Sequence, residues 1–307
     1  MNGLYRSLSI IALTIATQWF TGCHQGQRIV VESPISGTIH ISVDEDFKPV
    51  IDTQLKVFES SFPDAKIMVD YKPEAACLRD LANDSTRMVI VTRGLTLPEE
   101  INFRDSAKTP AISGIMAYDA VALVVNNHSR DSMMTMSEVR TLLEGNDPQK
   151  REAVMDGVSA TSTVRYAMDS ILMGKTLGKN VIAARTSPQV ISYVADHENA
   201  VGFIGVDWIG DDEDSTELAF LKMVKVVAIQ CDPCLNKPYV YPLQANIVLK
   251  RYPMVRGLYY ILKENFSGVG NNFVNFLVNE RGQLIFKKAY LVPARMNFDI
   301  RNVEIQQ

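Results

Sequence analysis

The sequence lacks an excess of positive charge, and it lacks an apolar run long enough to cross a membrane. Among its 307 residues, 31 Lys and Arg stand against 35 Asp and Glu, which gives a formal net charge of −4. Non-specific binding of nucleic acid requires a basic stripe, so the charge distribution excludes DNA and RNA as partners. A bilayer span needs about 20 apolar residues, and no segment reaches that length.

Motifs of hydrolases and metal enzymes are also missing. There is no Gly-x-Ser-x-Gly element and no His placed to activate a serine, so we expect no enzyme. The four His residues lack the spacing of metal ligands. Cys231 and Cys234 form one Cys-Asp-Pro-Cys unit without a second pair of ligands, which leaves a disulfide or free thiols in a turn between strands. We therefore expect neither a metal nor a cofactor.

The composition is that of a folded globular protein. Hydrophobic residues make up 47% of the sequence and charged residues 21%, which excludes a disordered or collagen-like chain. At this length folding buries roughly 75% of the extended-chain surface, so the chain can form one large domain or two medium lobes.

The N-terminus has the layout of a bacterial export signal. An apolar run at residues 8–16 follows Arg6, and small residues precede Cys23, as in the lipobox of lipoproteins. An ordinary signal peptide with an incidental cysteine is the alternative. If Cys23 is lipidated, residues 1–22 are removed and the net charge becomes −5. The remainder would then be soluble and extracytoplasmic, anchored to a bacterial membrane by lipid, on the periplasmic side.

Predicted strands and helices alternate in βαβ order, which indicates an α/β sheet covered by helices on both faces. The predicted strands cover residues 37–43, 66–71, 88–92, 120–125, 201–204, 221–229 and 241–249. The predicted helices cover residues 49–62, 74–83, 136–143, 254–265 and 271–290, with one more running from the loop at 159–166 to about 173.

Three loops lie where ligands bind in open α/β sheets, beyond the carboxyl end of a strand and before a helix. Their candidate binding residues are Asp44, Glu45 and Asp46 in the first loop, Thr92 and Arg93 in the second, and Ser159, Thr161, Ser162, Thr163 and Arg165 in the third. The third loop is rich in hydroxyls, whereas a helix cap needs only one. The surplus favours an anion ligand, with hydroxyls that merely face solvent as the alternative.

Short motifs, in order over nearly the whole chain, resemble the phosphate-binding proteins of Pst-type ABC transporters. Residues 37–42 with Pro49 resemble the family's opening strand and loop, and residues 85–95 resemble its strand ending in Ser-Arg-Pro-Leu. Residues 118–126 resemble its hinge strand, and residues 160–163 stand where it carries Gly-Ser-Gly-Thr.

This resemblance implies a two-lobe, type II periplasmic-binding-protein fold, in which each lobe is a mixed sheet flanked by helices and the ligand cleft lies between the lobes. Lobe I would comprise residues 35–119 and 223–307, and lobe II residues 120–222, with hinge strands near 118–126 and 221–229. The resemblance also implies a monomeric receptor that captures phosphate or a similar oxyanion and passes it to the permease subunits of an ABC importer.

The family's anion-binding residues are only partly present. The chain has three carboxylates in place of the family's Ser/Thr loop, Arg87 at its acidic position and Gly157 at its Arg position. One interpretation is a relocated pair, in which Arg87 supplies the positive charge and Glu45 accepts a hydrogen bond from a protonated phosphate oxygen. The other is that the carboxylates repel a dianion, so that the protein binds a different small solute or acts as a ligand-free sensor or adhesion protein.

Overall fold

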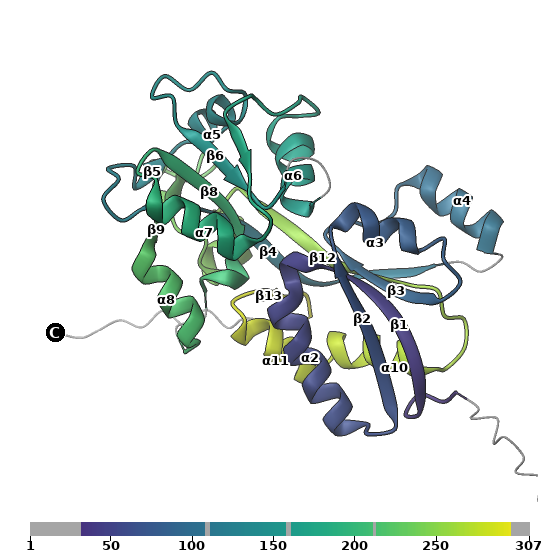
Figure 1. Cartoon of the computed structure of the whole chain (residues 1–307). Coiled ribbons are helices and arrows are strands. Elements are labelled where there is room, and N and C mark those ends of the chain that lie inside the picture. Colours follow the sequence, from purple (N-terminus) through teal and green to yellow (C-terminus); the bar gives the residue numbers. More distant parts are fainter. Residues whose placement is uncertain (1–31, 108–110, 158–160, 211–212, 296–307) are drawn as a thin grey trace, which may run out of the picture. The chain divides into compact units, whose positions relative to one another are not determined.

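The computed structural model describes residues 32–107, 111–157, 161–210 and 213–295, which form a mixed α/β structure (Figure 1). The export segment and Cys23 lie outside these residues. The strands are β1 (Gly37–Asp44), β2 (Ala65–Lys72), β3 (Thr86–Val91), β4 (Ile112–Asn126), β5 (Met133–Met134), β6 (Glu152–Met155), β7 (Val181–Ala183), β8 (Ala200–Gly205), β9 (Val224–Val226), β10 (Ala228–Gln230), β11 (Tyr239–Val240), β12 (Val255–Leu262) and β13 (Val292–Pro293).

The helices include three short irregular ones, which are the 3-10 helices η2 and η4 and the π-helix η3. In chain order they are η2 (Glu45–Phe47), α2 (Lys48–Ser61), α3 (Glu74–Asp80), α4 (Leu97–Ala107), α5 (Met136–Leu143), α6 (Ser162–Tyr166), η3 (Ala167–Ile171), α7 (Ser187–Asp196), η4 (Val206–Trp208), α8 (Ser215–Met223), α9 (Gln244–Val248), α10 (Val269–Val278) and α11 (Glu280–Lys288).

The main sheet runs in the order β2-β1-β3-β12-β4-β8-β6-β7, with β13 and β9 also pairing with β4. β1 is parallel to β2 and β3, whereas β12 is antiparallel to both β3 and β4. A small second sheet has the order β11-β10-β5. The parallel arrangement of β1, β2 and β3 confirms the βαβ order predicted from the sequence.

β4 joins two regions of the main sheet. It is 15 residues long. Its first part, residues 112–120, pairs with β12, and its last part, residues 121–126, pairs with β8 and β9. Figure 1 shows β4 running from the group of β1, β2 and β3 to the group of β6 and β8. The two regions are therefore connected through one continuous strand.

Apolar spacing explains why the N-terminal elements form as predicted. Val50, Ile51, Gln54 and Phe58 fall on one face of α2 and are buried, and Pro49 stands in its first turn, where a missing N–H costs nothing. α5 covers the predicted residues 136–143, because Thr135 caps its first turn in a capping box with Glu138.

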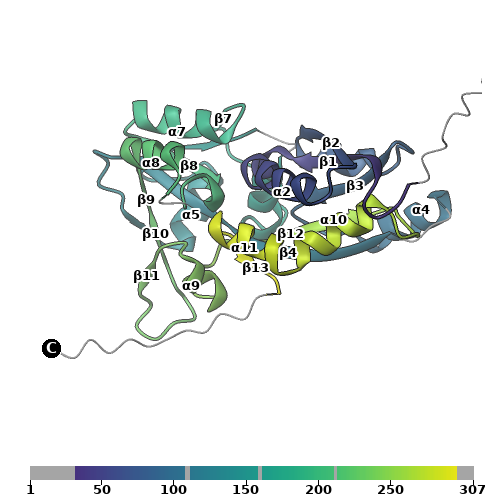
Figure 2. The ribbon, with the colours of Figure 1, turned by 90° about the horizontal axis from the view of Figure 1, so that it is seen from below.

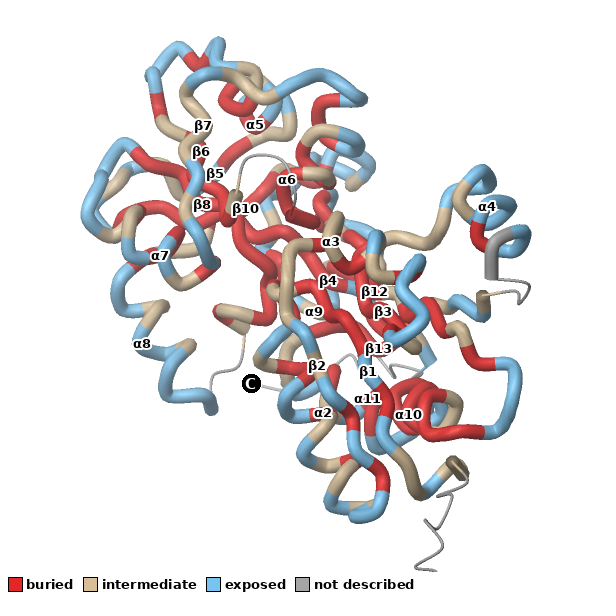
Figure 3. The backbone as a smooth tube through the Cα atoms, turned by 45° about the vertical axis from the view of Figure 1, so that its right-hand side comes forward, coloured by how far each residue is buried: buried red, intermediate tan, exposed pale blue. Residues whose placement is uncertain are grey.

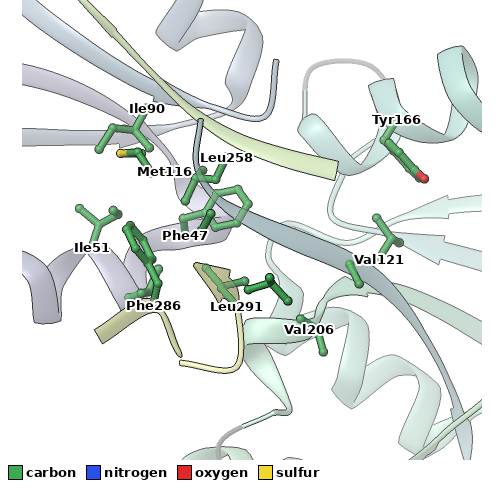
Figure 4. Packing of buried hydrophobic residues seen from close by; sticks show 14 of the residues in the cluster. Phe47, Ile51, Ile90, Met116, Val121, Tyr166, Val206, Leu258, Phe286 and Leu291 are labelled. Carbon is green, nitrogen blue, oxygen red and sulfur yellow. The ribbon is translucent and has the colours of Figure 1, made fainter. Parts of the chain in front are cut away.

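The core is divided among three clusters. The largest contains aromatic and aliphatic side chains from both regions of the sheet, and Figure 4 shows Phe47, Met116 and Leu258 gathered in it. A second lies between α7 and strands β4, β6 and β8. A third packs α3 and α4 on β3. Figure 2 shows α10 and α11 along β12 and β4, on the sheet's other face. Figure 3 shows the central strands buried, whereas α8 has no buried residue.

The C-terminal third differs most from the prediction. Residues 254–265 are not a helix, because Val255–Leu262 form β12 in the middle of the sheet. Its consecutive apolar residues fit a strand covered on both faces as well as a helix. Residues 241–249 are not a strand, because Pro242 cannot donate to a ladder and α9 begins two residues later.

Two further boundaries were wrong. The strand predicted at residues 221–229 is split, because Asp214 caps α8 and the helix continues to Met223 before β9 and β10. The helix predicted at residues 271–290 is broken at Asn279, where ψ is 177°. α11 then packs closely on α10, and at Gly282 a Cβ atom would lie 2.4 Å from the Phe276 carbonyl oxygen.

Replacing Phe58 with alanine is expected to lower the free energy of unfolding by ~3–5 kcal/mol, because its fully buried ring contacts the rings of Phe62, Phe273 and Phe276. Urea unfolding followed by circular dichroism measures the loss. The control is Leu235→Ala, since Leu235 is 90% exposed, and it should change stability by less than about 0.5 kcal/mol. Equal losses in both variants would contradict this description of the core.

Candidate functional site

The candidate site lies at the carboxyl ends of β1 and β3, where η2 and the residues after β3 meet the start of α6. Asp46 is its central residue and is 2% exposed. Its Oδ2 atom accepts hydrogen bonds from Ser162 Oγ at 3.0 Å and from Thr163 Oγ1 at 2.9 Å. Both hydroxyls come from the loop predicted to bind an anion. They are bonded instead to a carboxylate of the chain itself.

Arg256 on β12 completes this cluster. Its Nη2 atom lies 3.3 Å from Asp46 Oδ2, and its Nη1 atom donates to Ser162 Oγ at 2.9 Å and to Thr163 Oγ1 at 3.2 Å. Its Nε atom donates to Asp119 Oδ2 at 2.7 Å. The guanidinium also lies over the ring of Phe47, 5.3 Å from its centroid. Burial lowers the pKa of Arg256, but the charges of Asp119 and Asp46 outweigh burial and raise it, so the cation is permanent.

A second cluster lies beside the first. Glu74, at the start of α3, is buried, and its Oε2 atom accepts from Thr92 N at 2.8 Å and from Thr92 Oγ1 at 2.6 Å. Arg165 donates from Nε to Glu74 Oε1 and from Nη2 to Thr92 Oγ1, the latter at 2.8 Å. A buried carboxylate and an arginine thus connect α3, the end of β3 and α6.

Carboxyl groups outnumber cations around Arg256. Asp44, Asp119, Asp156 and Asp207 are all buried next to Asp46 or Arg256. Burial is the largest cause that raises the pKa of each, and the charge of Asp46 adds to it.

The pKa of Asp46 itself moves the other way. Burial raises it, but hydrogen bonding from Asp156 and the charge of Arg256 outweigh burial and hold it below its usual range. Asp46 therefore ionises more readily than its buried neighbours, and burial together with the charge of Asp46 raises the pKa of Asp156. Asp207 packs against Gly205, where a Cβ atom would lie 2.5 Å from Asp207 Oδ1.

Six of the predicted binding residues meet in these two clusters. They are Asp46, Thr92, Thr161, Ser162, Thr163 and Arg165. Thr161 is the helix cap, because its Oγ1 atom accepts from Val164 N while donating to Asp156 Oδ1. Asp44 is buried behind Asp46 and accepts from its backbone N–H at 3.4 Å. Ser159 lies outside the described residues.

Three predicted residues do not contribute to these clusters. Arg87 is at the amino end of β3, where it pairs with Glu264 at 3.2 Å and Glu32 at 3.3 Å, so the relocated-charge prediction was wrong. Glu45 is half-buried, and no described residue hydrogen-bonds to its carboxylate; Asp46 takes the inward position. Arg93 forms a bidentate pair with Glu99 at 2.7 and 2.8 Å, beside the second cluster.

Sequence reasoning missed Arg256, Glu74, Asp119, Asp156, Asp207 and Trp208. The signal for two of them was a single charge inside an apolar strand, Asp119 in Tyr118–Asn126 and Arg256 in Val255–Leu262. Such a charge is buried at a high cost unless it is paired. Trp208 on η4 donates from Nε1 to the backbone oxygen of Asp46 at 2.9 Å.

A cavity of about 280 Å³ opens beside the second cluster. Its lining residues are Glu74, Ala75, Leu78, Arg79, Arg93, Glu99, Thr161 and Arg165. A larger, more apolar cavity of about 570 Å³ lies elsewhere, along β4, β12 and α9. The first cavity gives solvent an approach to the site residues.

Of the described cysteines, only Cys77 lies near the site, on α3 one turn after Glu74. Cys231 and Cys234 form a disulfide with Cα atoms 5.4 Å apart, in the turn between β10 and β11, and Cys77 is a buried free thiol. Within the described residues, no group of His, Cys, Asp and Glu has the arrangement of a metal site. In the same part of the chain, no helix is both long and apolar enough to cross a membrane.

Two regions of sheet that share a strand, with a polar cluster where their loops meet, define a two-lobe, type II periplasmic-binding-protein fold. Residues 30–281 match the family model described as PBP superfamily domain, and the chain belongs to this superfamily of solute-binding proteins. The fold class predicted from the sequence is confirmed. No curated protein matches the sequence significantly.

Solved structures with this fold are similar over most of the chain. A Vibrio cholerae ABC-type phosphate transport receptor is 20% identical with a TM-score of 0.62, covering 84% of this chain and 100% of the receptor. A Clostridium perfringens protein with bound phosphate, named as a phosphate ABC transporter substrate-binding protein, is 19% identical with a TM-score of 0.69 over 84% and 100%. The regulatory domain of Synechocystis CcmR in complex with 2-PG is 10% identical with a TM-score of 0.55 over 79% and 96%.

The buried carboxyls are expected to make the protein less stable at pH 8 than at pH 5. The folded protein keeps protons on Asp44, Asp156 and Asp207 that the unfolded chain releases above about pH 4, so the free energy of unfolding falls as the pH rises through the raised pKa values. Urea unfolding at both pH values, followed by Trp208 fluorescence, measures the fall.

Asp156→Asn should reduce this fall, because an amide has no proton to lose as the pH rises. The groups facing Asp156 are Asp44, Asp46 and Arg256. The control is Asp64→Asn, since Asp64 is exposed after α2 and should leave the pH dependence unchanged. An undiminished fall in the Asp156 variant would show that Asp156 does not contribute to the pH dependence.

Proposed function

We propose that this protein is an extracytoplasmic solute-binding receptor, without enzymatic activity, that delivers an inorganic oxyanion to an ABC importer, with phosphate as the first candidate. One observation carries the proposal. The Ser162 and Thr163 hydroxyls and the Arg256 guanidinium converge on a single anionic oxygen. Donors arranged in this way suit the oxygens of a tetrahedral anion, which an arginine fork matches in shape and charge.

The names of the two transport relatives support phosphate. Both the Vibrio cholerae and the Clostridium perfringens proteins are described as phosphate receptors or binding proteins of ABC transporters. The carboxyl groups can also serve such a ligand, because a protonated carboxyl such as Asp156 donates to a phosphate oxygen and an ionised one accepts from a protonated phosphate. In this proposal the acidic surroundings select a partly protonated anion.

Lobe movement belongs to the same proposal. Residues 35–119 and 223–307 would form lobe I and residues 120–222 lobe II, with β4 and the segment 221–229 as hinges. Ser162, Thr163 and Arg165 then come from lobe II, whereas Asp46, Glu74 and Thr92 come from lobe I. Their contacts would hold the closed form, and ligand would enter when the lobes separate.

We also propose that Cys23 carries the lipid that anchors a monomeric receptor near its permease, after removal of residues 1–22. The basis is the apolar run and the small residues ahead of Cys23. A single lipidated N-terminus leaves the binding domain free to reach the permease.

Phosphate at 10 mM is expected to raise the melting temperature of residues 24–307, because a ligand that binds only the folded state stabilises it by mass action. The double variant Ser162→Ala, Thr163→Ala should bind at least tenfold more weakly in calorimetry, since each hydrogen bond to a charged group contributes about 1.5–3 kcal/mol. The control is Ser192→Ala, because Ser192 is an exposed hydroxyl on α7. Sulfate and molybdate titrations test which oxyanion is preferred.

The phosphate proposal is contradicted if neither the wild type nor an Asp46→Asn variant gains stability or releases heat with phosphate. Binding of sulfate in its place would keep an oxyanion receptor and remove phosphate as its ligand.

For the anchor, growth with a radioactive fatty acid should label the wild-type protein and leave Cys23→Ser unlabelled. Thr17→Ser, a conservative change in the same segment, should keep the label. A labelled Cys23→Ser protein would contradict lipidation at this residue.

A further inference from the structure

The donors of the proposed anion site are already occupied by the chain itself. Each hydroxyl has one proton to donate, and Ser162 and Thr163 both donate theirs to Asp46 Oδ2. Their lone pairs accept from Arg256 Nη1, and Arg256 Nη2 also points at Asp46 Oδ2. An external anion cannot use these donors while the Asp46 carboxylate remains on them.

Asp46 is held firmly in this position. Its backbone oxygen accepts from Trp208 Nε1 at 2.9 Å, and its backbone N–H donates to Asp44 Oδ1 at 3.4 Å. The next residue, Phe47, has no exposed surface and lies under the Arg256 guanidinium. The carboxylate is therefore fixed by its own backbone and by its neighbour.

The second cluster also holds a buried carboxylate of the chain on an arginine and a hydroxyl. Glu74, from the segment after β2, presents a buried carboxylate to Arg165 on α6, and Thr92 hydrogen-bonds to both. Two carboxylates from the segments after β1 and β2 thus reach across to hydroxyls and an arginine at the start of α6. The charge that a bound anion would bring is supplied from within the chain at both places.

We propose that the Asp46 carboxylate is an internal ligand of the oxyanion site, which closes the protein on itself and sets its affinity for external anions. This inference rests on the proposed function, because the site that Asp46 fills is the one assigned to the oxyanion. The Asp46 carboxylate and an external anion need the same donors, so they exclude each other. The presence of the carboxylate therefore lowers the affinity for the external anion. Asp46 is accordingly the residue that decides how tightly the site binds phosphate.

Removing the charge of Asp46 is expected to strengthen phosphate binding. Asp46→Asn keeps the side-chain shape, whereas Asp46→Ser empties the position and restores a hydroxyl. The measurement is calorimetric titration with inorganic phosphate at constant ionic strength. Whichever Asp46 variant binds phosphate more tightly should show an affinity at least tenfold higher than the wild type, since coupling between sites is commonly about 5- to 150-fold.

The matched control is Glu45→Gln, which removes a carboxylate from the adjacent residue. Glu45 is half-buried in the same 3-10 turn, and no described residue donates to its side chain. If lower negative charge in the loop were the only cause, Glu45→Gln would raise phosphate affinity as much as the Asp46 variants do. An equal gain in Glu45→Gln would therefore overturn the proposal. Wild-type affinity equal to that of both Asp46 variants would also overturn it.

Trp208 gives an independent readout of closure. The sequence has two Trp residues, Trp19 and Trp208, so residues 24–307 contain Trp208 alone. Trp208 Nε1 donates to the backbone oxygen of Asp46, so this hydrogen bond requires the two segments to be held together as in the closed form. Acrylamide should therefore quench Trp208 fluorescence weakly in the wild type even without phosphate, and adding phosphate should not change the quenching. In Asp46→Ser, quenching should be strong without phosphate and should fall by at least twofold when phosphate binds.

The two measurements separate failure of this inference from failure of the proposed function. If no variant binds phosphate or sulfate while Trp208 is still protected in the wild type and exposed in Asp46→Ser, internal closure stands and the oxyanion function is wrong. If the wild type binds phosphate tightly and its quenching falls on binding, the oxyanion function stands and the internal ligand is wrong. If an Asp46 variant does not fold, shown by circular dichroism, the wild-type quenching with and without phosphate decides alone.

Discussion

The buried guanidinium of Arg256 is the charge on which the arrangement of the surrounding segments depends. It is 4% exposed, and a cation removed from water at such a position is stable only when anionic and polar partners surround it. Those partners come from β4, η2 and α6, which are far apart in the sequence. Taking away any one of them would leave an incompletely compensated charge, so the guanidinium holds three separate segments at fixed positions.

The negative charge of the buried carboxyls is limited by protonation rather than by additional cations. Five buried aspartates surround one arginine, and burial raises the pKa of four of them. A carboxyl that stays neutral is a hydrogen-bond donor as well as an acceptor, so the same side chains that would repel an anion when ionised can bind one when protonated. The net acidity of the chain therefore says little about the field inside its site, which depends on which carboxyls keep their protons.

The sequence allowed the class of fold to be predicted and several residues of the candidate site to be proposed, because both rest on local patterns. Strand ends and the loops that follow them located Asp46, Thr92, Ser162, Thr163 and Arg165. The partners of these residues could not be predicted in the same way. The Ser162 and Thr163 hydroxyls bond to a residue more than 100 positions away, and no local pattern specifies such a pairing.

Arg256 shows how one error in secondary structure hides a site residue. Its segment was predicted as a helix, in which a single charge can face solvent. As a central strand, the same segment has no exposed residue and Arg256 falls at a buried position, so its charge must be paired inside the protein. Arg87 is also misplaced: it lies on β3, one residue before the predicted strand and at the end opposite the site, where Glu32 and Glu264 pair with it.

Arg256 and Asp119 are directly opposite each other in the antiparallel ladder of β12 and β4. Side chains alternate between the two faces of a strand, so the face on which Arg256 stands is fixed by its register against β4. β4 changes partner from β12 to β8 just beyond this rung, at residues 120 and 121. Inserting or deleting one residue of β12 just before Arg256 would shift its register against β4. The guanidinium would then turn to the other face of the sheet. Every binding residue would then remain in the sequence, but Asp46, Ser162 and Thr163 would have lost their cation.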